Sequence, residues 1–275
     1  MIDAEPTTIC RTDTLFRWQG KTLPGARLDP ARPAPPDSPC LVFLHEALGS
    51  IRLWHDFPEA LVAATGLPAL VYERLGHGGA DPLTLPRGLD YLHIEAEQIL
   101  PAVLDQAGIA RAIPIGHSDG GSIALLFAAA FPGRVAAAVT MAAHVFVEAV
   151  TVAGVHEAMA LYRTTDLPEK LAKYHGANTE TLFRAWAETW TSEAFRHWNI
   201  EDCLPSIVCP LLALQGADDE YATPAQVHAI CRGVRGPATP LLIPDCAHQP
   251  QRQQRAAVLV AIAGFMRGDS AGGTP

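Results

Sequence analysis

The segment from Ile113 to Ser122 places one serine in a context that favours chemistry. It predicts a short buried strand, then the pattern Gly-His-Ser-Asp-Gly, then a helix rich in alanine and leucine. A serine on such a sharp turn is lifted out of the sheet, and its neighbours must be glycines because side chains there would collide with adjacent elements. The helix N-terminus offers free N–H groups to developing negative charge. We therefore expect Ser118 to be a nucleophile.

A nucleophilic serine also needs a base and a third group that holds the base in place. The predicted strand Leu211–Gln215 leads into Gly-Ala-Asp-Asp-Glu, where Asp219 is our candidate for the acid and Asp218 is the alternative. His248 follows the last predicted strand and precedes the last helix. Groups that follow parallel strands share one rim of the sheet. The order Ser118, Asp219, His248 predicts a serine–histidine–aspartate triad.

These motifs resemble those of the α/β-hydrolase fold over essentially the whole chain. Gly116–Gly120 corresponds to the nucleophile elbow, Gly216–Asp219 to the acid loop and Cys246–His248 to the histidine loop. The Ser-Asp-Gly-Gly form of the elbow is similar to that of small serine esterases of the valacyclovir-hydrolase kind. The resemblance implies the same three roles for the serine, aspartate and histidine named above.

Acyl transfer also requires donors for the oxyanion of the tetrahedral intermediate. One is the backbone N–H of Asp119, and the resemblance implies that Ala47 supplies the other. The loop that begins at His45 carries Glu46 where the family usually has glycine. A carboxylate beside an oxyanion would oppose catalysis. We therefore expect Glu46 to point away from it, as an ionised group in a hydrogen bond or salt bridge.

The elements needed to position these groups alternate along the chain. Apolar strands interleaved with helices predict an α/β fold with a mostly parallel, twisted sheet and helices on both faces. This alternation of strands and helices stops in 145–205, where helical periodicity predicts an inserted helical cap. A Pro/Gly-rich stretch, Pro24–Pro39, separates an N-terminal strand from the first buried one. We expect the core to comprise 1–144 and 206–267, the cap to comprise 145–205, and 268–275 to be a disordered tail.

A substrate bound between the sheet rim and the cap would meet residues from both. The candidate pocket residues are Glu46, His144, Trp186 and Trp190. Large apolar side chains also hold a small cap together, so packing is the alternative role for the two tryptophans.

Composition excludes several classes of partner. The net charge of −9 argues against nucleic acid and against anionic membrane surfaces. The six cysteines and eleven histidines form no ligand pattern, which predicts free thiols and no metal site. The apolar stretches are too short to span a bilayer. We expect a cytoplasmic protein that acts on a small molecule without a cofactor, and leave a homodimer open.

The predicted reaction is hydrolysis of a small carboxylic ester through an acyl-enzyme. Within the enzyme class the alternatives are a carbon–carbon bond hydrolase of ring-cleavage products, a lactonase and a thioesterase. A non-catalytic α/β-hydrolase scaffold that binds a ligand is the alternative from another class.

Overall fold

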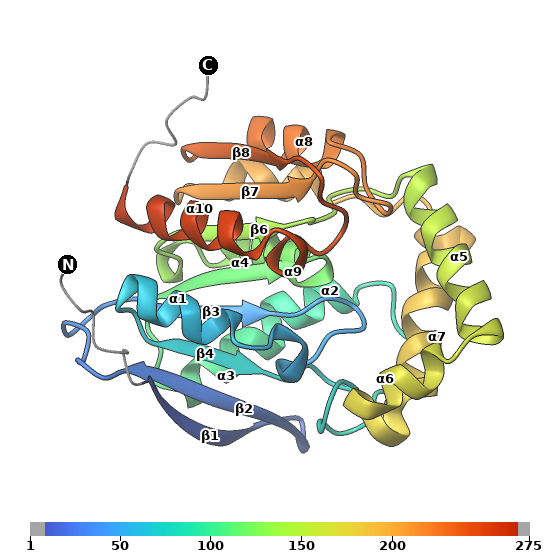
Figure 1. Ribbon diagram of the computed structural model, residues 1–275, viewed down its shortest axis with the longest axis horizontal. Helices are drawn as coiled ribbons and strands as arrows, with labels where there is room; N and C mark the ends of the chain where they lie inside the picture. Colours follow the sequence, from blue (N-terminus) through green and yellow to red (C-terminus); the bar gives the residue numbers. More distant parts are fainter. Residues whose placement is uncertain (1–8, 269–275) are drawn as a thin grey trace.

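The computed structural model describes residues 9–268, in which one eight-stranded sheet is covered by helices on both faces (Figure 1). The strand order is β1-β2-β4-β3-β5-β6-β7-β8, and only β2 runs against the other strands. The strands are β1 (Ile9–Trp18), β2 (Lys21–Pro30), β3 (Cys40–Leu44), β4 (Ala69–Tyr72), β5 (Ala112–His117), β6 (Ala138–Met141), β7 (Leu211–Gly216) and β8 (Ala238–Ile243).

The helices divide between the two faces of the sheet and the region 145–205, in which the sequence predicts a cap. The helices are α1 (Phe57–Thr65), α2 (Tyr91–Ile94), α3 (Leu100–Gln106), α4 (Asp119–Ala130), α5 (Ala149–Thr164), α6 (Leu167–His175), α7 (Thr179–Trp190), α8 (Ala225–Gly233), α9 (Pro250–Gln253) and α10 (Arg255–Arg267). One face is covered by α1 and α10, and the other by α3, α4 and α8 (Figure 1). Every residue of β3, β5 and β7 is buried, as expected of strands covered on both sides.

The predicted cap region 145–205 contains α5, α6 and α7, which leave the sheet after β6 and return to it at β7. They lie at the carboxyl ends of the parallel strands, at the right of Figure 1. The division into domains stays a prediction. Apart from Gly268, the predicted tail 268–275 lies outside the described residues. No helix within 9–268 has the length and apolar character needed to cross a bilayer.

One expectation about the N-terminal region is wrong. The first part of the stretch Pro24–Pro39 does not separate two strands but belongs to one, because β2 continues through Pro24 and Gly25 to Pro30. The strand buries Leu23 and other apolar residues against the core. Gly25 is required there, since a Cβ would come within 2.6 Å of the Phe16 ring. Pro24 and Gly25 are typical of turns, but in this strand they allow close packing.

The face covered by α1 gives a test of the packing. Phe43 is fully buried on β3, and its ring lies 5.4 Å from that of Trp54 and 6.3 Å from that of Phe57. We expect Phe43→Ala to lower the free energy of unfolding in urea by about 3–5 kcal/mol. Val260→Ala removes a side chain that is 72% exposed and should change it by less than about 0.5 kcal/mol. Equal effects of the two substitutions would contradict this packing.

Candidate active site

Ser118 lies on a tight turn between β5 and α4. Its φ angle of 53° is positive, which residues other than glycine rarely adopt, and its N–H donates to the Met141 carbonyl at 2.9 Å. A Cβ on Gly116 would overlap the carbonyl oxygen of Gly120, and one on Gly120 would overlap that of Leu44. The glycines of the motif therefore allow the elbow to pack against β3 and its own strand.

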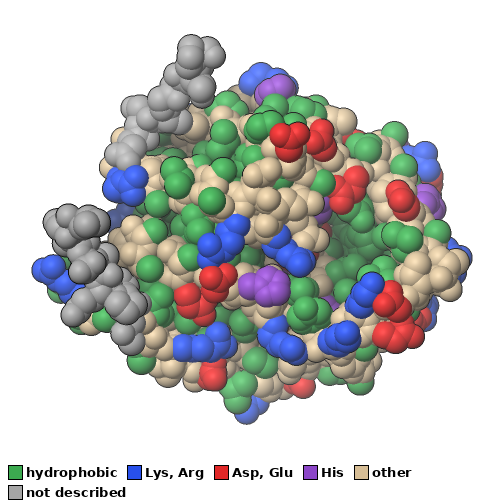
Figure 2. Space-filling model, viewed as in Figure 1, with side chains coloured by type: hydrophobic (Ala, Val, Ile, Leu, Met, Phe, Trp, Pro, Cys, Tyr) green, Lys and Arg blue, Asp and Glu red, His purple; other side chains and the backbone are tan. Residues whose placement is uncertain are grey.

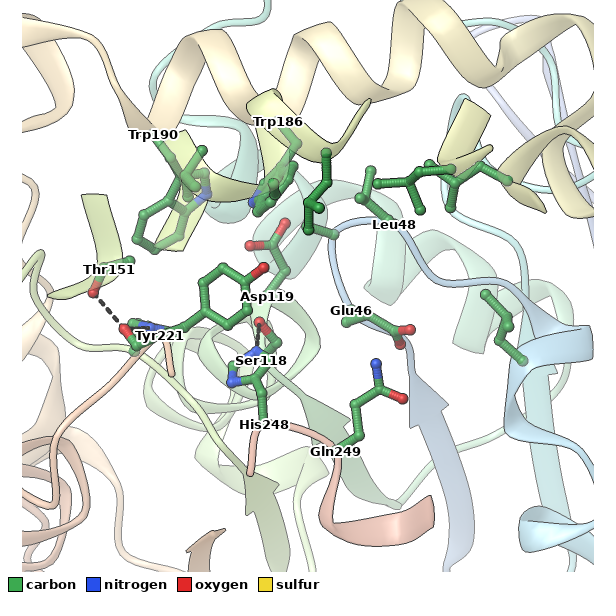
Figure 3. A pocket seen from close by; sticks show the side chains of 18 of the residues that line it. Glu46, Leu48, Ser118, Asp119, Thr151, Trp186, Trp190, Tyr221, His248 and Gln249 are labelled. Carbon is green, nitrogen blue, oxygen red and sulfur yellow. Dashed lines mark hydrogen bonds between the residues drawn. The ribbon is translucent and has the colours of Figure 1, made fainter. Parts of the chain in front are cut away.

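The structure brings the three predicted triad residues into one chain of hydrogen bonds, of which Figure 3 shows the link between Ser118 and His248. The Ser118 hydroxyl lies 3.0 Å from Nε2 of His248. Nδ1 of His248 lies 2.8 and 3.0 Å from the two carboxylate oxygens of Asp219. Burial opposes ionisation of Asp219, but its hydrogen bond to His248 and the charge of that ring bring the pKa of Asp219 below its usual value. The aspartate can thus act as an ionised acceptor for the ring.

The choice between the two neighbouring aspartates follows from the loop after β7. Asp219 is buried against His248, whereas the side chain of Asp218 is exposed. The Asp219 carboxylate also accepts the backbone N–H of Tyr221 at 2.9 Å. Glu220, which the sequence did not single out, accepts the backbone N–H of His248 at 3.0 Å. Two adjacent acids therefore hold the side chain and the backbone of the histidine.

Asp119 faces a buried network that joins the elbow to the cap. Its carboxylate accepts the Tyr91 hydroxyl at 3.0 Å and lies 3.6 Å from the Arg74 guanidinium. The indole N–H of Trp190, on α7, donates to the same tyrosine hydroxyl at 3.0 Å. Arg87 lies over the Tyr91 ring, 3.8 Å from its centre. Nothing in the sequence marked Tyr91 as a member of this site.

Three histidines bind successive carbonyls of the predicted oxyanion loop, 46–48. Nδ1 of His45 lies 2.9 Å from the Glu46 oxygen, Nε2 of His77 lies 3.0 Å from that of Ala47, and Nε2 of His175 lies 3.0 Å from that of Leu48. Burial lowers the pKa of all three rings, that of His45 to about 3. The loop is therefore held by neutral imidazoles, one of which, His175, belongs to the cap.

Glu46 lines the cavity, but its carboxylate points away from Ser118 (Figure 3). It lies 3.3 Å from Nδ1 of His117, and Nε2 of that ring donates to the His248 carbonyl at 2.7 Å. Burial alone would raise the pKa of Glu46. The hydrogen bond and charge of His117 lower it instead, to about 2. The carboxylate is thus ionised at neutral pH and supports the ring that holds the histidine loop.

A cavity of about 350 Å³ opens above Ser118, between the sheet rim and the cap. Figure 2 shows it as a hollow with hydrophobic walls. The predicted pocket residues Glu46, His144, Trp186 and Trp190 all line it. Its apolar wall also includes Leu48, Val155, Ala158 and Leu171.

Tyr221 is a lining residue that the sequence did not reveal. Its ring lies 4.8 Å from that of His248, and its carbonyl accepts the Thr151 hydroxyl of the cap at 2.6 Å. The tyrosine lies two residues after Asp219, and only this proximity in the chain could have pointed to it. Within residues 9–268, no group of three or more His, Cys, Asp or Glu side chains is arranged to hold a metal ion.

Comparison with known proteins gives the family. Residues 39–191, more than half of the chain, match the α/β hydrolase fold family. The chain belongs to this family, and this membership supports a hydrolytic enzyme.

Curated relatives match a shorter segment. The sn-1-specific diacylglycerol lipase ABHD11 of Mus musculus is 32% identical over 90 residues, which are 33% of this chain and 28% of that protein. Lipase LipV of Mycobacterium tuberculosis is 39% identical over 90 residues, which are 33% of this chain and 30% of that protein. The match thus spans less than a third of either relative.

Solved structures resemble the whole fold. The enol-lactonase from Burkholderia xenovorans LB400 is 20% identical with a TM-score of 0.68, over 92% of this chain and 100% of that one. Naproxen esterase from Bacillus subtilis is 19% identical with a TM-score of 0.69, over 94% of this chain and 92% of that one. At these identities the likeness shows the fold alone.

The lowered pKa of Glu46 predicts how its contribution to stability depends on pH. The pKa is about 2 in the folded protein and about 4.3 in an unfolded chain. The carboxylate therefore stabilises the fold above the unfolded value, and this contribution is lost as the pH falls from about 4.5 to 2. We expect the loss of unfolding free energy in Glu46→Gln, measured in urea, to be largest near pH 6 and to shrink towards pH 2.

Glu157→Gln is the control, because this glutamate is exposed on α5. Its effect should be small at each pH. An effect of Glu46→Gln that stays constant, or grows, as the solution is acidified would refute the ionised contact with His117.

Proposed function

We propose that this protein is a serine hydrolase that cleaves a small carboxylic ester through an acyl-enzyme. The observation that carries the proposal is the continuous hydrogen-bond chain from Asp219 through His248 to Ser118 at the floor of the cavity. The family match and the lipases among the curated relatives support it. Six free cysteines suit a reducing compartment, so we propose that the protein acts in the cytoplasm.

The proposed reaction has two half-reactions. The Ser118 oxygen attacks the ester carbonyl carbon while Nε2 of His248 takes its proton. The tetrahedral intermediate then collapses, and the alcohol leaves with the proton from the imidazolium. Water, activated by the same histidine, attacks the acyl-enzyme and releases the acid. Asp219 stabilises the imidazolium that forms in each step.

The negative charge of each intermediate falls on the former carbonyl oxygen. We assign its donors to the backbone N–H groups of Asp119 and Ala47. The first lies at the start of α4, where the leading N–H groups have no partner within the helix. The second belongs to the loop held by the three histidines. Fixed donors of this kind stabilise the transition state without reorganisation.

The cavity supports an uncharged, largely apolar substrate. Its volume of about 350 Å³ lies at the lower end of the range for small-molecule sites. Five leucines and two tryptophans contribute to its wall. A lactone is a cyclic ester and would react in the same way, whereas a thioester or a vinylogous diketone would place different leaving groups above Ser118. Measured hydrolysis rates for an open ester, a lactone, a thioester and a vinylogous diketone distinguish these alternatives. We expect the open ester to react fastest.

Replacing the nucleophile tests the enzyme class. We expect Ser118→Ala to abolish turnover of p-nitrophenyl acetate and labelling by a fluorophosphonate, since both require the serine oxygen. Ser122→Ala is the matched control, because this buried serine lies one turn further along α4 and should retain both. Full activity of Ser118→Ala would contradict Ser118 as the nucleophile. Absence of both turnover and labelling in the wild-type protein would leave only a ligand-binding role.

The adjacent aspartates provide a test of the triad acid. We expect Asp219→Asn to lower kcat by about 10³–10⁴-fold, because the amide favours the wrong tautomer of His248. Asp218→Asn changes an exposed neighbour and should leave kcat within about threefold of wild type. Steady-state kinetics on one ester measure both. The assignment of Asp219 would be overturned by equal losses, or by a larger loss in Asp218→Asn.

A further inference from the structure

The carbonyl oxygen of Glu46 is a point where several donors converge. It accepts Nη2 of Arg74 at 2.8 Å, Nδ1 of His45 at 2.9 Å and the backbone N–H of Gly49 at 2.9 Å. A carbonyl oxygen has two lone pairs, so three donors, one of them cationic, are an unusual concentration. This oxygen belongs to the same peptide unit as the N–H of Ala47.

Arg74 also determines which ring nitrogen of His45 carries the proton. The backbone N–H of Arg74 donates to Nε2 of His45 at 3.2 Å, so the proton of the neutral ring is on Nδ1. Burial and the charge of Arg74 lower the pKa of His45 to about 3, which keeps the ring neutral. Nδ1 therefore donates to the Glu46 carbonyl. One arginine thus acts on this peptide directly through its side chain and indirectly through its backbone.

The geometry of the peptide unit transmits this contact to Ala47. In a trans peptide the C=O and N–H bonds point in opposite directions. Because the Glu46 oxygen is fixed on the Arg74 side, the N–H of Ala47 points away from that side. Ala47 lines the cavity together with Ser118, and no hydrogen bond of residues 9–268 uses its N–H. Donors on the carbonyl also polarise the peptide and make its N–H a stronger donor.

The charge of Arg74 acts on three buried carboxyl groups, those of Glu73, Glu95 and Asp119, and of these Asp119 lies at ion-pair distance. The side chain is 1% exposed, and Asp119, at 3.6 Å, forms its ion pair within the described chain. Nε and Nη1 have no hydrogen-bond partner among the residues described. The same Asp119 carboxylate accepts the Tyr91 hydroxyl, which spreads its charge further. A buried positive charge with few partners favours a nearby developing anion.

We propose that Arg74 is a positioning residue of the oxyanion hole: it fixes and polarises the Glu46–Ala47 peptide so that the Ala47 N–H binds the oxyanion. The inference rests on the proposed serine hydrolase function and adds a residue to it. Arg74 is not among the residues that line the cavity. Arg74 therefore stabilises the tetrahedral intermediate and not the bound, unreacted substrate.

Two ketone inhibitors distinguish the tetrahedral intermediate from the bound ground state. A trifluoromethyl ketone is attacked by Ser118: a C–O bond forms, the carbonyl electron pair moves to oxygen, and the serine proton passes to His248. The matching methyl ketone binds in the same cavity as an unreacted carbonyl compound. We expect Arg74→Met to lower kcat for p-nitrophenyl acetate by about 10–100-fold and to weaken trifluoromethyl ketone inhibition by the same factor. KM and the methyl ketone affinity should change by less than about threefold.

Arg134→Met is the matched control, because Nη2 of this arginine also donates to a backbone carbonyl, that of Ile109 at 2.8 Å, but Arg134 does not line the cavity. It should retain kcat and both affinities within about threefold. Where Arg74→Met does not fold, the pair His45→Phe and His45→Asn replaces it. Phenylalanine removes the second donor and should weaken trifluoromethyl ketone inhibition, whereas asparagine, which keeps an N–H near Nδ1, should restore it.

Three results would overturn the proposal: unchanged trifluoromethyl ketone inhibition in Arg74→Met, equal weakening of both ketones, or an equal effect of Arg134→Met. If His45→Phe is the variant measured, unchanged inhibition by the trifluoromethyl ketone contradicts the proposal in the same way. Failure of the proposed function is recognised separately, because the wild-type protein would then neither turn over the ester nor be labelled by the fluorophosphonate.

Discussion

The backbone of α4 approaches the end of β3 so closely that no side chain fits between them. A Cβ on Gly120 would overlap the carbonyl oxygen of Leu44, the last residue of β3. The loop that follows β3 carries Ala47, and the turn that precedes α4 carries Ser118. The contact therefore fixes how far the nucleophile lies from the loop that would hold the oxyanion. The positive φ angle of Ser118 is tolerated within this packing.

The same close approach of backbones recurs where the acid and histidine loops meet. A Cβ on Gly216 would overlap the carbonyl oxygens of Cys246 and Ala247, and the Asp218 N–H donates to the Cys246 oxygen at 2.9 Å. These contacts align the residues that follow β7 and β8, so that Asp219 reaches His248. From the cap, Trp190 contacts Tyr91, which in turn contacts Asp119. Core and cap thus share one polar network beneath the cavity.

The sequence predicts those site residues whose roles depend on their neighbours in the chain. Ser118 and His248 were predictable because glycines and strand ends leave a pattern along the chain. Asp218 and Asp219 have the same chemistry, so only the path of the loop distinguishes them. β2 was missed because Pro24 and Gly25 signal a turn, while its burial depends on distant residues such as Phe16. Arg74 acts through a carbonyl 28 positions away, and no local pattern reports such a contact.

The central claim is that Ser118 becomes acylated during turnover. The direct measurement is mass spectrometry of the protein quenched during reaction with a slowly hydrolysed ester, followed by peptide mapping. The account predicts an added mass equal to the acyl group on the peptide that contains Ser118, which disappears as hydrolysis is completed. Turnover without an adduct, or an acyl group on a cysteine or another serine, would contradict it.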